Sequence, residues 1–183
     1  MRPTSDVGPH DTGGRPDPAI APDDPRRPDV VALLEAHLAL MRSLSPPGSV
    51  HALDLDGLCA PDVTFWTLRE GGVPLSCGAL RALEPLPNGN GHDSIGHNSI
   101  GHGEIKSMHT LGAARGRGLG ERMLLHVMAV ARARGYGRLS LETGRPASFG
   151  AAQRLYARHG FRECPPFGSY THDPFSLCMT RTL

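Results

Sequence analysis

A glycine- and arginine-rich segment between a predicted strand and a predicted helix constrains this chain more than any other feature. Residues 104–110 read as a strand and lead into residues 112–120, where Gly116, Gly118 and Gly120 alternate with other residues before an amphipathic helical pattern. Glycines let a ligand approach the main chain, and the free N–H groups and dipole of a helix start attract negative charge. The segment therefore predicts a phosphate-binding turn.

The spacing within this segment excludes two common phosphate sites. It reads G-x-G-x-G, so the dinucleotide pattern G-x-G-x-x-G is absent, and there is no Walker A lysine. Arg115 and Arg117 can add charge-assisted contacts to a phosphate. The plain alternative is an arginine-rich helix start without a ligand, although three glycines weaken a helix and call for a compensating role.

The remaining pattern predicts a mixed α/β domain with helices packed on a central sheet. The first half of the chain is expected to form a helix with Asp29 as its N-cap that ends at Ser45-Pro46-Pro47, a short helix within residues 49–58, and a hairpin with strands at 63–70 and 73–83. The second half is expected to form a strand at 104–110, a helix that ends at Gly135 and Gly137, and a strand at 138–143. A helix at 148–159, a strand from Phe161 and a last strand at 175–183 are expected to follow.

Residues 1–28 hold seven of the 17 prolines and few apolar side chains, which predicts a disordered extension with a short edge strand near residues 19–21. Residues 29–183 are expected to form one domain with a low-complexity loop inserted at about 86–103, where a five-residue unit repeats. The repeat places His92, His97 and His102 five residues apart, which is not a usual metal-ligand spacing, so no metal is expected.

Charge and cysteine usage narrow the class of protein. Nineteen Lys and Arg against 18 Asp and Glu give a net charge of +1, so neither a nucleic-acid nor a membrane-surface partner is expected. No apolar run approaches the length of a membrane span. The four cysteines stand singly without a CxxC pair, which favours a reduced, cytoplasmic protein. A homodimer is compatible with the sequence.

Two motifs together resemble a known family. Arg115-x-x-Gly118-x-Gly120, placed between strand and helix, resembles the pyrophosphate motif of the GNAT superfamily of acetyl-CoA-dependent N-acetyltransferases. Leu155-Tyr156, followed by Gly160-Phe161, is similar to the LYxxxGF signature of that superfamily. The resemblance covers about residues 30–183 and extends to small bacterial acetyltransferases. It implies a GNAT-like mixed sheet, mainly antiparallel, flanked by helices and splayed at the cofactor site.

The resemblance also implies roles for individual residues. Tyr156 would protonate the departing CoA sulfur, with packing as the alternative role. Glu104 would be the general base, unless it pairs with Lys106 on the same strand face, Glu142 replaces it, or ordered water removes the proton. Phe149 stands where many members carry a cofactor-binding asparagine. Acetyl-CoA itself would contact Met108, His109, Thr110, Arg115, Gly116, Arg117, Gly118, Leu119 and Gly120.

The function implied is direct transfer of acetyl from acetyl-CoA to a primary amine of a small molecule or peptide in a ternary complex. The alternatives are a non-catalytic acyl-CoA-binding regulatory module and an enzyme that uses another nucleotide. Alternation along residues 104–110 also predicts that Glu104, Lys106 and Met108 share one face of their strand. The residues expected near the mouth of the acceptor site are His51, Asp54, Asp56, Tyr170 and His172.

Overall fold

The computed structural model describes residues 17–46, 49, 54–83 and 101–183. Their centre is a seven-stranded sheet with the strand order β1-β2-β3-β4-β5-β7-β6. Every neighbouring pair is antiparallel except β4 and β5, which run parallel, so the predicted mixed and mainly antiparallel sheet is confirmed. The strands are β1 (Ala19–Pro22), β2 (Val63–Glu70), β3 (Val73–Ala82), β4 (Gly101–Thr110), β5 (Tyr136–Gly144), β6 (Arg162–Glu163) and β7 (Ser176–Thr182).

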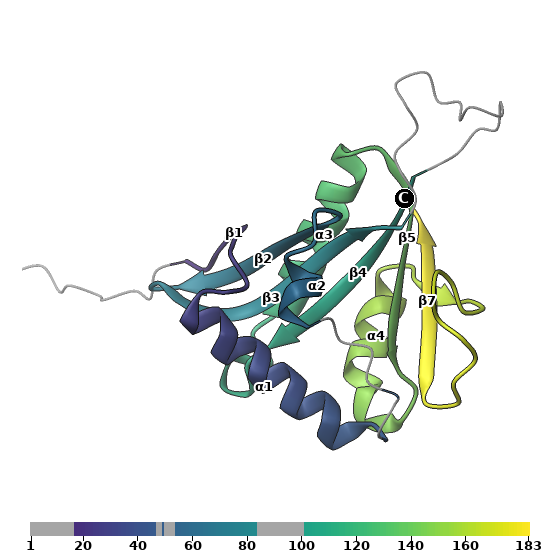
Figure 1. Ribbon diagram of the computed structural model, residues 1–183, viewed down its shortest axis with the longest axis horizontal. Coiled ribbons are helices and arrows are strands. Elements are labelled where there is room, and N and C mark those ends of the chain that lie inside the picture. The colour runs from purple at the N-terminus through teal and green to yellow at the C-terminus, as the bar shows by residue number, and fades with distance from the viewer. Residues whose placement is uncertain (1–16, 47–48, 50–53, 84–100) are drawn as a thin grey trace, which may run out of the picture.

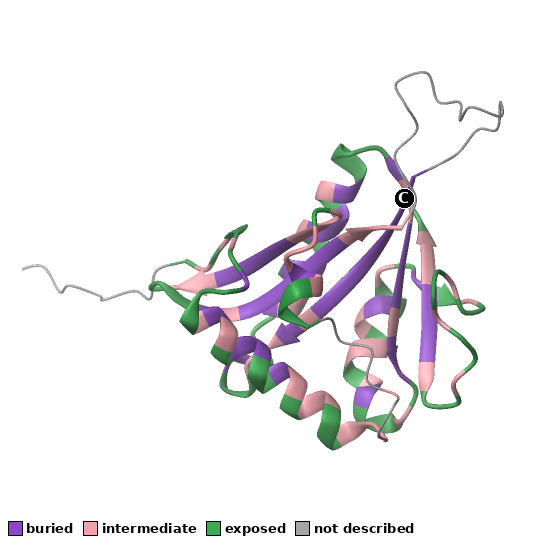
Figure 2. Cartoon of the chain, viewed as in Figure 1, coloured by how far each residue is buried: buried purple, intermediate pink, exposed green. Residues whose placement is uncertain are grey.

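Helices cover both faces of the sheet (Figure 1), and the central strands β2 to β5 are mostly buried between them (Figure 2). A smaller apolar cluster joins the first two helices to Phe65, Cys77 and Ala79 of β2 and β3. A larger cluster joins the last two helices to the opposite face. The helices are α1 (Pro28–Leu44), α2 (Leu55–Leu58), α3 (Leu119–Ala133) and α4 (Gly150–Arg158), with short 3-10 turns at Gly112–Ala114 and Ala147–Phe149.

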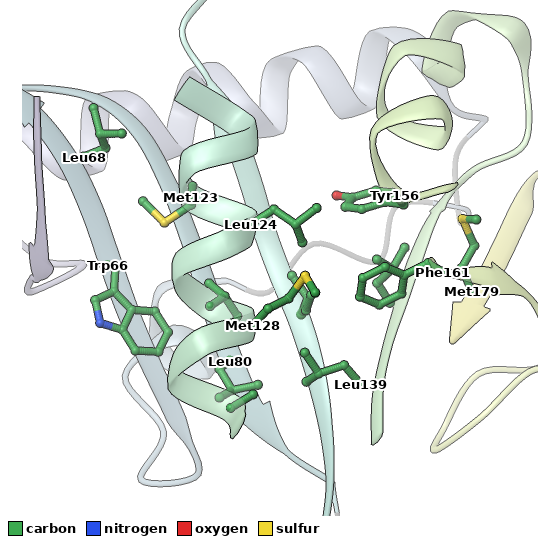
Figure 3. Packing of buried hydrophobic residues seen from close by; sticks show 14 of the residues in the cluster. Trp66, Leu68, Leu80, Met123, Leu124, Met128, Leu139, Tyr156, Phe161 and Met179 are labelled. Atoms are coloured by element: carbon green, nitrogen blue, oxygen red, sulfur yellow. The ribbon is translucent and has the colours of Figure 1, made fainter. Parts of the chain in front are cut away.

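The amphipathic helix predicted after the glycine segment is α3, and it lies at the centre of the larger cluster. Met123, Leu124 and Met128 are at most 2% exposed. Figure 3 shows these side chains between Trp66 and Leu80 on one side and the aromatic rings near α4 on the other. The helix ends as predicted at Gly135, whose φ of 83° is readily adopted only by glycine.

The start of α1 differs from the prediction. Its N-cap is Arg27 and Pro28 occupies the first helical turn, where the fixed φ of proline suits the helix. Asp29 therefore lies inside the helix, so its predicted role as N-cap is wrong. Its carboxylate instead accepts a hydrogen bond of 2.6 Å from Arg69 of β2.

Arg69 also holds the N-terminal edge of the sheet in place, through hydrogen bonds to Asp23. β1 pairs with β2, which confirms the predicted edge strand, while residues 1–16 lie outside the described part of the chain. Just after β1, Asp23 accepts bonds of 2.9 and 2.7 Å from Arg69 and one from Thr67. Burial raises the pKa of Asp23, but these hydrogen bonds outweigh that effect and hold it below its usual value. The hydrogen bond from Arg69 lowers the pKa of Asp29 to about 2.

We expect Arg69→Met to lower the free energy of unfolding at pH 7 by about 1–2 kcal/mol, because Asp23 loses its charged partner. A carboxyl with a depressed folded pKa stabilises the protein above its unfolded pKa and loses that effect as the pH falls. Stability of the native protein should therefore decline as the pH falls from about 4 toward 2, and the variant should decline less steeply over that window. Urea unfolding across pH measures both effects.

The control for this prediction is Arg81→Met, which breaks the pair that Arg81 forms with Asp62 at 2.9 Å. Both side chains are more than a third exposed, so this loss should be smaller. Equal losses in the two variants, or an unchanged acid profile for Arg69→Met, would contradict the role assigned to Arg69.

β4 begins earlier than predicted and changes its alternation near its end. It starts at Gly101, so the last copy of the repeat, including the buried His102, belongs to the sheet rather than to the predicted insertion. Ser107 has a φ of 52°, and the register with β3 shifts beside it. This bulge turns Met108 toward the α3 side, where its sulfur lies near Gly78 and Met123. The prediction that Met108 shares a face with Glu104 and Lys106 is therefore wrong.

The parallel strands β4 and β5 separate before they end. Their last paired residues are Ile105 and Leu141, although β4 continues to Thr110 and β5 to Gly144. The predicted splay is thus present, and Figure 1 shows the two strands diverging. Among the described residues, no helix is long and apolar enough to cross a membrane.

Candidate active site

A cleft of about 400 Å³ lies at the start of α3, between the ends of α1 and β4 and the side of α4. We call it the glycine cleft. Eight of the nine residues predicted to bind the cofactor line it, namely Met108, His109, Thr110, Arg115, Gly116, Gly118, Leu119 and Gly120. The fold therefore brings the predicted residues together around one hollow.

The glycines of the cleft have the backbone that the sequence predicted. Gly116 and Gly118 have φ values of 76° and 75°, a region that side chains disfavour, and a Cβ on either would meet no atom within 4 Å. Gly118 is the N-cap of α3 and supplies no capping side chain. The first N–H groups of α3 therefore remain available to an anion beside open space.

The two arginines of the segment behave differently. Arg115 lines the glycine cleft, and its Nε donates to the carbonyl of Thr110 at 3.2 Å. Arg117 does not line the cleft; its guanidinium donates to the carboxylate of Glu70 at the β2–β3 turn. The predicted phosphate contact of Arg117 is thus not supported by its position, because a carboxylate already engages it. Sequence alone gave no sign of this pairing across 47 residues.

A second hollow, of about 120 Å³, opens between the diverging strands. We call it the inner pocket. It is lined by residues of α1, β4, β5 and α4, and five of its residues also line the glycine cleft: Met41, Met108, Phe149, Ala152 and Tyr156. The two hollows are therefore neighbours, and Tyr156 lines both of them.

Tyr156 is only 6% exposed and packs edge-to-face on Phe161, so the packing role considered for it is real. Figure 3 shows its hydroxyl pointing from α4 toward Leu124 of α3. Burial, and to a smaller extent the charge of Glu142, raises the pKa of Tyr156 well above its usual value. The hydroxyl therefore stays protonated through the neutral range and can donate a proton.

Glu104, the base that the resemblance implied, lines neither hollow. It is 2% exposed, accepts a hydrogen bond of 2.6 Å from the Tyr170 hydroxyl and lies 3.3 Å from Lys106 Nζ. Lys106 in turn donates to Tyr170 at 2.6 Å. The alternative pairing with Lys106 is thus what the structure contains, and the position of Glu104 does not support a role as base.

Glu142, the rival carboxylate, does line the inner pocket. It is the first residue of β5 beyond the last pair with β4, and its carboxylate accepts a hydrogen bond from Ser176 of β7. Its charge also affects the pKa of both Tyr156 and Tyr170. Glu142 is therefore a pocket carboxylate close enough to both tyrosines to affect their pKa values.

Two histidines separate the hollows on the α1 side. His37 lines the inner pocket, His109 lines the glycine cleft, and their rings are in contact with centroids 5.0 Å apart and planes tilted by 48°. Burial is the main cause that lowers the pKa of each to about 4, so both are neutral at pH 7. His109 thus contributes a packed, uncharged wall to the cleft.

Phe149 fills the place of the cofactor-binding asparagine of the family. It is 8% exposed, lines both hollows, and lies against Gly144 at the end of β5. A Cβ on Gly144 would come within 2.2 Å of the ring. Gly144 is therefore glycine because the ring occupies the space that a side chain would need.

We expect Gly144→Ala to destabilise the protein by about 1–3 kcal/mol, because the methyl group and the Phe149 ring cannot share that space. Thermal unfolding measures the loss. Gly150→Ala is the matched control: its Cβ would meet only the flexible end of Arg154, at 3.2 Å, so it should be close to neutral. A Gly144→Ala protein as stable as this control would contradict the packing described.

Of the five residues predicted at the mouth of the acceptor site, the four that the structure describes are not brought together. Asp54 caps α2 through a bond to the N–H of Gly57, and Asp56 pairs with Arg26 on the surface. Both line a separate groove between α1 and α2. His172 lies in the β6–β7 loop region, away from both hollows, and Tyr170 reaches the inner pocket only through Lys106.

Of the three histidines of the repeat, only His102 lies within the described residues. His92, His97 and His51 lie outside the described residues. His102 hydrogen-bonds Ser140 at 2.8 Å within the sheet. Within residues 17–46, 49, 54–83 and 101–183, no three His, Cys, Asp or Glu side chains are grouped to hold a metal ion.

Comparison with known proteins decides the family. The acetyltransferase (GNAT) family matches residues 31–161. The chain belongs to the GNAT family of acetyltransferases. An N-acetyltransferase of Bacillus subtilis, YsnE, whose activity is not characterised, is 42% identical over 161 residues, which is 88% of this chain and 97% of that protein.

Solved structures agree with the GNAT assignment. An acyl-CoA N-acyltransferase from Klebsiella pneumoniae superposes with a TM-score of 0.66 at 28% identity, covering 91% of this chain and 97% of the other. A GNAT acetyltransferase from Elizabethkingia anophelis with acetyl-CoA bound has the same fold, with a TM-score of 0.59 at 16% identity and coverage of 91% and 98%. The predicted fold and enzyme class are thus confirmed.

Proposed function

We propose that this GNAT enzyme transfers the acetyl group of acetyl-CoA to a primary amine by direct attack in a ternary complex. One observation carries the proposal: the glycine cleft and the inner pocket lie side by side where β4 and β5 separate, and Tyr156 lines both. A thioester held in the first hollow and an amine held in the second would then face each other beside a proton donor.

The residues of the glycine cleft fit a CoA pyrophosphate. Uncapped N–H groups of α3, open space beside Gly116 and Gly118, and the guanidinium of Arg115 together make an anion site. Beyond Ile105, β4 no longer pairs with β5, which leaves main-chain groups near Met108 available to the arm of the cofactor. Acetyl-CoA supplies the activated acetyl group, and the protein orients it.

The chemistry requires a neutral amine and a protonated leaving group. We assign the carboxylate that faces the amine to Glu142 rather than Glu104, because only Glu142 lines the inner pocket. Tyr156 remains protonated at neutral pH and would donate its proton to the CoA sulfur. Lys106 and Tyr170 hold Glu104 in place, which makes it part of the wall rather than a reactant.

Two measurements test the proposal. Thermal shift with acetyl-CoA, CoA, NAD and ATP should show stabilisation by the first two only, since a ligand that binds the folded state raises its stability. A screen of primary amines for release of free CoA thiol should then identify an acceptor. Stabilisation without thiol release from any amine would favour the alternative, a non-catalytic acyl-CoA-binding module. Stabilisation by NAD or ATP instead would overturn both.

A cytoplasmic location is part of this proposal. The four cysteines are free thiols in the structure, as expected of a protein kept in a reducing compartment.

A further inference from the structure

The inner pocket has two walls of opposite character. The β5 wall carries the carboxylate of Glu142, and the facing β4 and α1 wall carries Lys106, Ser107 and His37. Lys106 and Glu142 are the first residues of their strands beyond the last β4–β5 pair, so the splay places the Lys106 ammonium, which also contacts Glu104 and Tyr170, and the Glu142 carboxylate on either side of one small hollow. A ligand with both a positive and a negative end would match these walls.

Two buried polar atoms on the β4 and α1 wall have no hydrogen-bond partner among the described residues. They are Nδ1 of His37 and Oγ of Ser107, and the two residues are only 7% and 8% exposed. An unsatisfied buried polar atom is unfavourable, so such atoms in a pocket wall indicate a bound polar group. Both atoms lie on residues that line the inner pocket, on the same side as the Lys106 ammonium.

The backbone at Ser107 supports the same interpretation. Ser107 is the only residue other than glycine with a positive φ in the described part of the chain, and a β-branched or larger side chain would be strained there. Its carbonyl accepts a hydrogen bond from the Cys77 thiol at 3.2 Å, which helps fix the bulge. Strained backbone next to a pocket is typical of a binding site.

The size of the pocket limits the ligand. About 120 Å³ is well below the roughly 300–1,000 Å³ typical of sites for drug-sized ligands. A compact molecule of a few heavy atoms fits better than the end of a polypeptide.

We propose that the acceptor is a small free amino acid. Its amine would lie beside Glu142 and Tyr156, and its carboxylate would bind the wall formed by Lys106, Ser107 and His37. This inference rests on the acetyl-transfer function proposed above and names the acceptor class.

The reaction balances without any further reactant. The amine nitrogen forms a bond to the acetyl carbonyl carbon as the carbon–sulfur bond breaks. An amino acid that enters as an ammonium loses two protons on becoming an amide. Glu142 or a water molecule beside it accepts one of them. Tyr156 donates its own proton to the CoA thiolate and regains one from the amine. The products are an N-acetyl amino acid, CoA thiol and one proton.

The test uses the full chain and compares its activity toward acceptors that differ only in their carboxyl end. Thiol release from acetyl-CoA is measured with the common amino acids, their α-carboxamides, the corresponding amines without a carboxyl group, and dipeptides. We expect kcat/KM for the preferred amino acid to exceed that of its carboxamide by about 10- to 100-fold, the usual effect of hydrogen bonds to a charged group. The amine of the carboxamide is less basic and hence more often neutral, so this preference would run against intrinsic reactivity.

Variants of the β4 and α1 wall test whether its residues cause the preference for the amino acid over its carboxamide. In Glu104→Gln/Lys106→Gln both buried charges are removed together, and the ratio of acid to amide should fall toward one. The matched control, Glu104→Gln alone, keeps the ammonium and removes only the carboxylate paired with it, so the ratio should stay at the native value or rise. Ser107→Ala should lower the ratio severalfold. Because both substrates report on the same folded molecules, the ratio does not depend on how much of a variant folds.

Each outcome decides between the proposals. A carboxamide, simple amine or dipeptide used as well as the amino acid would overturn the acceptor class and leave acetyl transfer intact. The same holds if the double variant keeps the wild-type ratio. No thiol release from any acceptor, with acetyl-CoA bound, would overturn the proposed function itself.

Discussion

Replacing Gly120 with valine is expected to abolish acetyl-CoA binding without unfolding the protein. Gly120 is the second residue of α3 and lines the glycine cleft. Its Cβ would lie 3.5 Å from Thr110 Oγ1 and 3.9 Å from Leu155, which are ordinary contacts, so the folded protein has room for a first methyl group. The pyrophosphate, however, would have to approach the main chain through that same space.

The alanine variant separates binding from stability. Alanine favours a helix over glycine by about 0.5–1 kcal/mol, so Gly120→Ala should be as stable as the native protein or slightly more stable. Its affinity for acetyl-CoA should nevertheless fall, and Gly120→Val should show at least a 100-fold loss, about 2.7 kcal/mol or more. Calorimetric titration and thermal unfolding on the same samples measure the two opposite changes.

Gly112 provides the control for this experiment. A Cβ there would meet no atom within 4 Å, and the residue does not line the glycine cleft. Gly112→Ala should therefore bind acetyl-CoA normally. Unchanged affinity in Gly120→Val would mean that the pyrophosphate does not bind at the start of α3, and the cofactor site would have to be placed elsewhere.

The elements of the fold could be predicted because local patterns determine them. The β2–β3 hairpin follows from a run rich in β-branched and aromatic residues at 63–70, the Gly71-Gly72 turn and the mostly apolar run that returns after it, and α3 follows from its apolar stripe. Errors arose where a neighbour in space decided the outcome. Asp29 looks like an N-cap, but the helix already begins at Pro28, and the Asp29 carboxylate accepts a hydrogen bond from Arg69 instead.

The site was predicted less fully than the fold, for a related reason. A motif shows which residues meet a ligand at the main chain, and eight of the nine residues predicted from it and the strand before it line the cleft. Side-chain partners far apart in sequence leave no local signal: Arg117 pairs with Glu70, and Glu104 with Tyr170. The bulge at Ser107 breaks the alternation on which the face of Met108 was predicted. Glu142 was recognisable as a candidate, but only the splay distinguishes it from Glu104.

Tyr156→Phe is expected to lower kcat by on the order of 100-fold, which is the typical contribution of one general acid. Acetyl-CoA affinity should stay nearly unchanged. The substitution removes only the hydroxyl and keeps the ring packed against Phe161. The phenol holds its proton over the whole neutral range, as tyrosine ordinarily does; burial and the charge of Glu142 raise its pKa further, so it gives up that proton only to a strongly basic group such as the departing thiolate. Stopped-flow or steady-state thiol release, together with calorimetry, separates rate from binding.

The choice of acyl donor makes this prediction specific to proton donation. A thioester whose thiol is more acidic than CoA leaves more readily as a thiolate, so Tyr156→Phe should reduce its turnover less than that of acetyl-CoA. Tyr136→Phe, which alters another buried tyrosine that lines neither hollow, should leave both rates unchanged. An equal loss with both donors, or a loss of acetyl-CoA affinity in place of rate, would assign Tyr156 to packing, and catalysis would then rest on how the two hollows position thioester and amine.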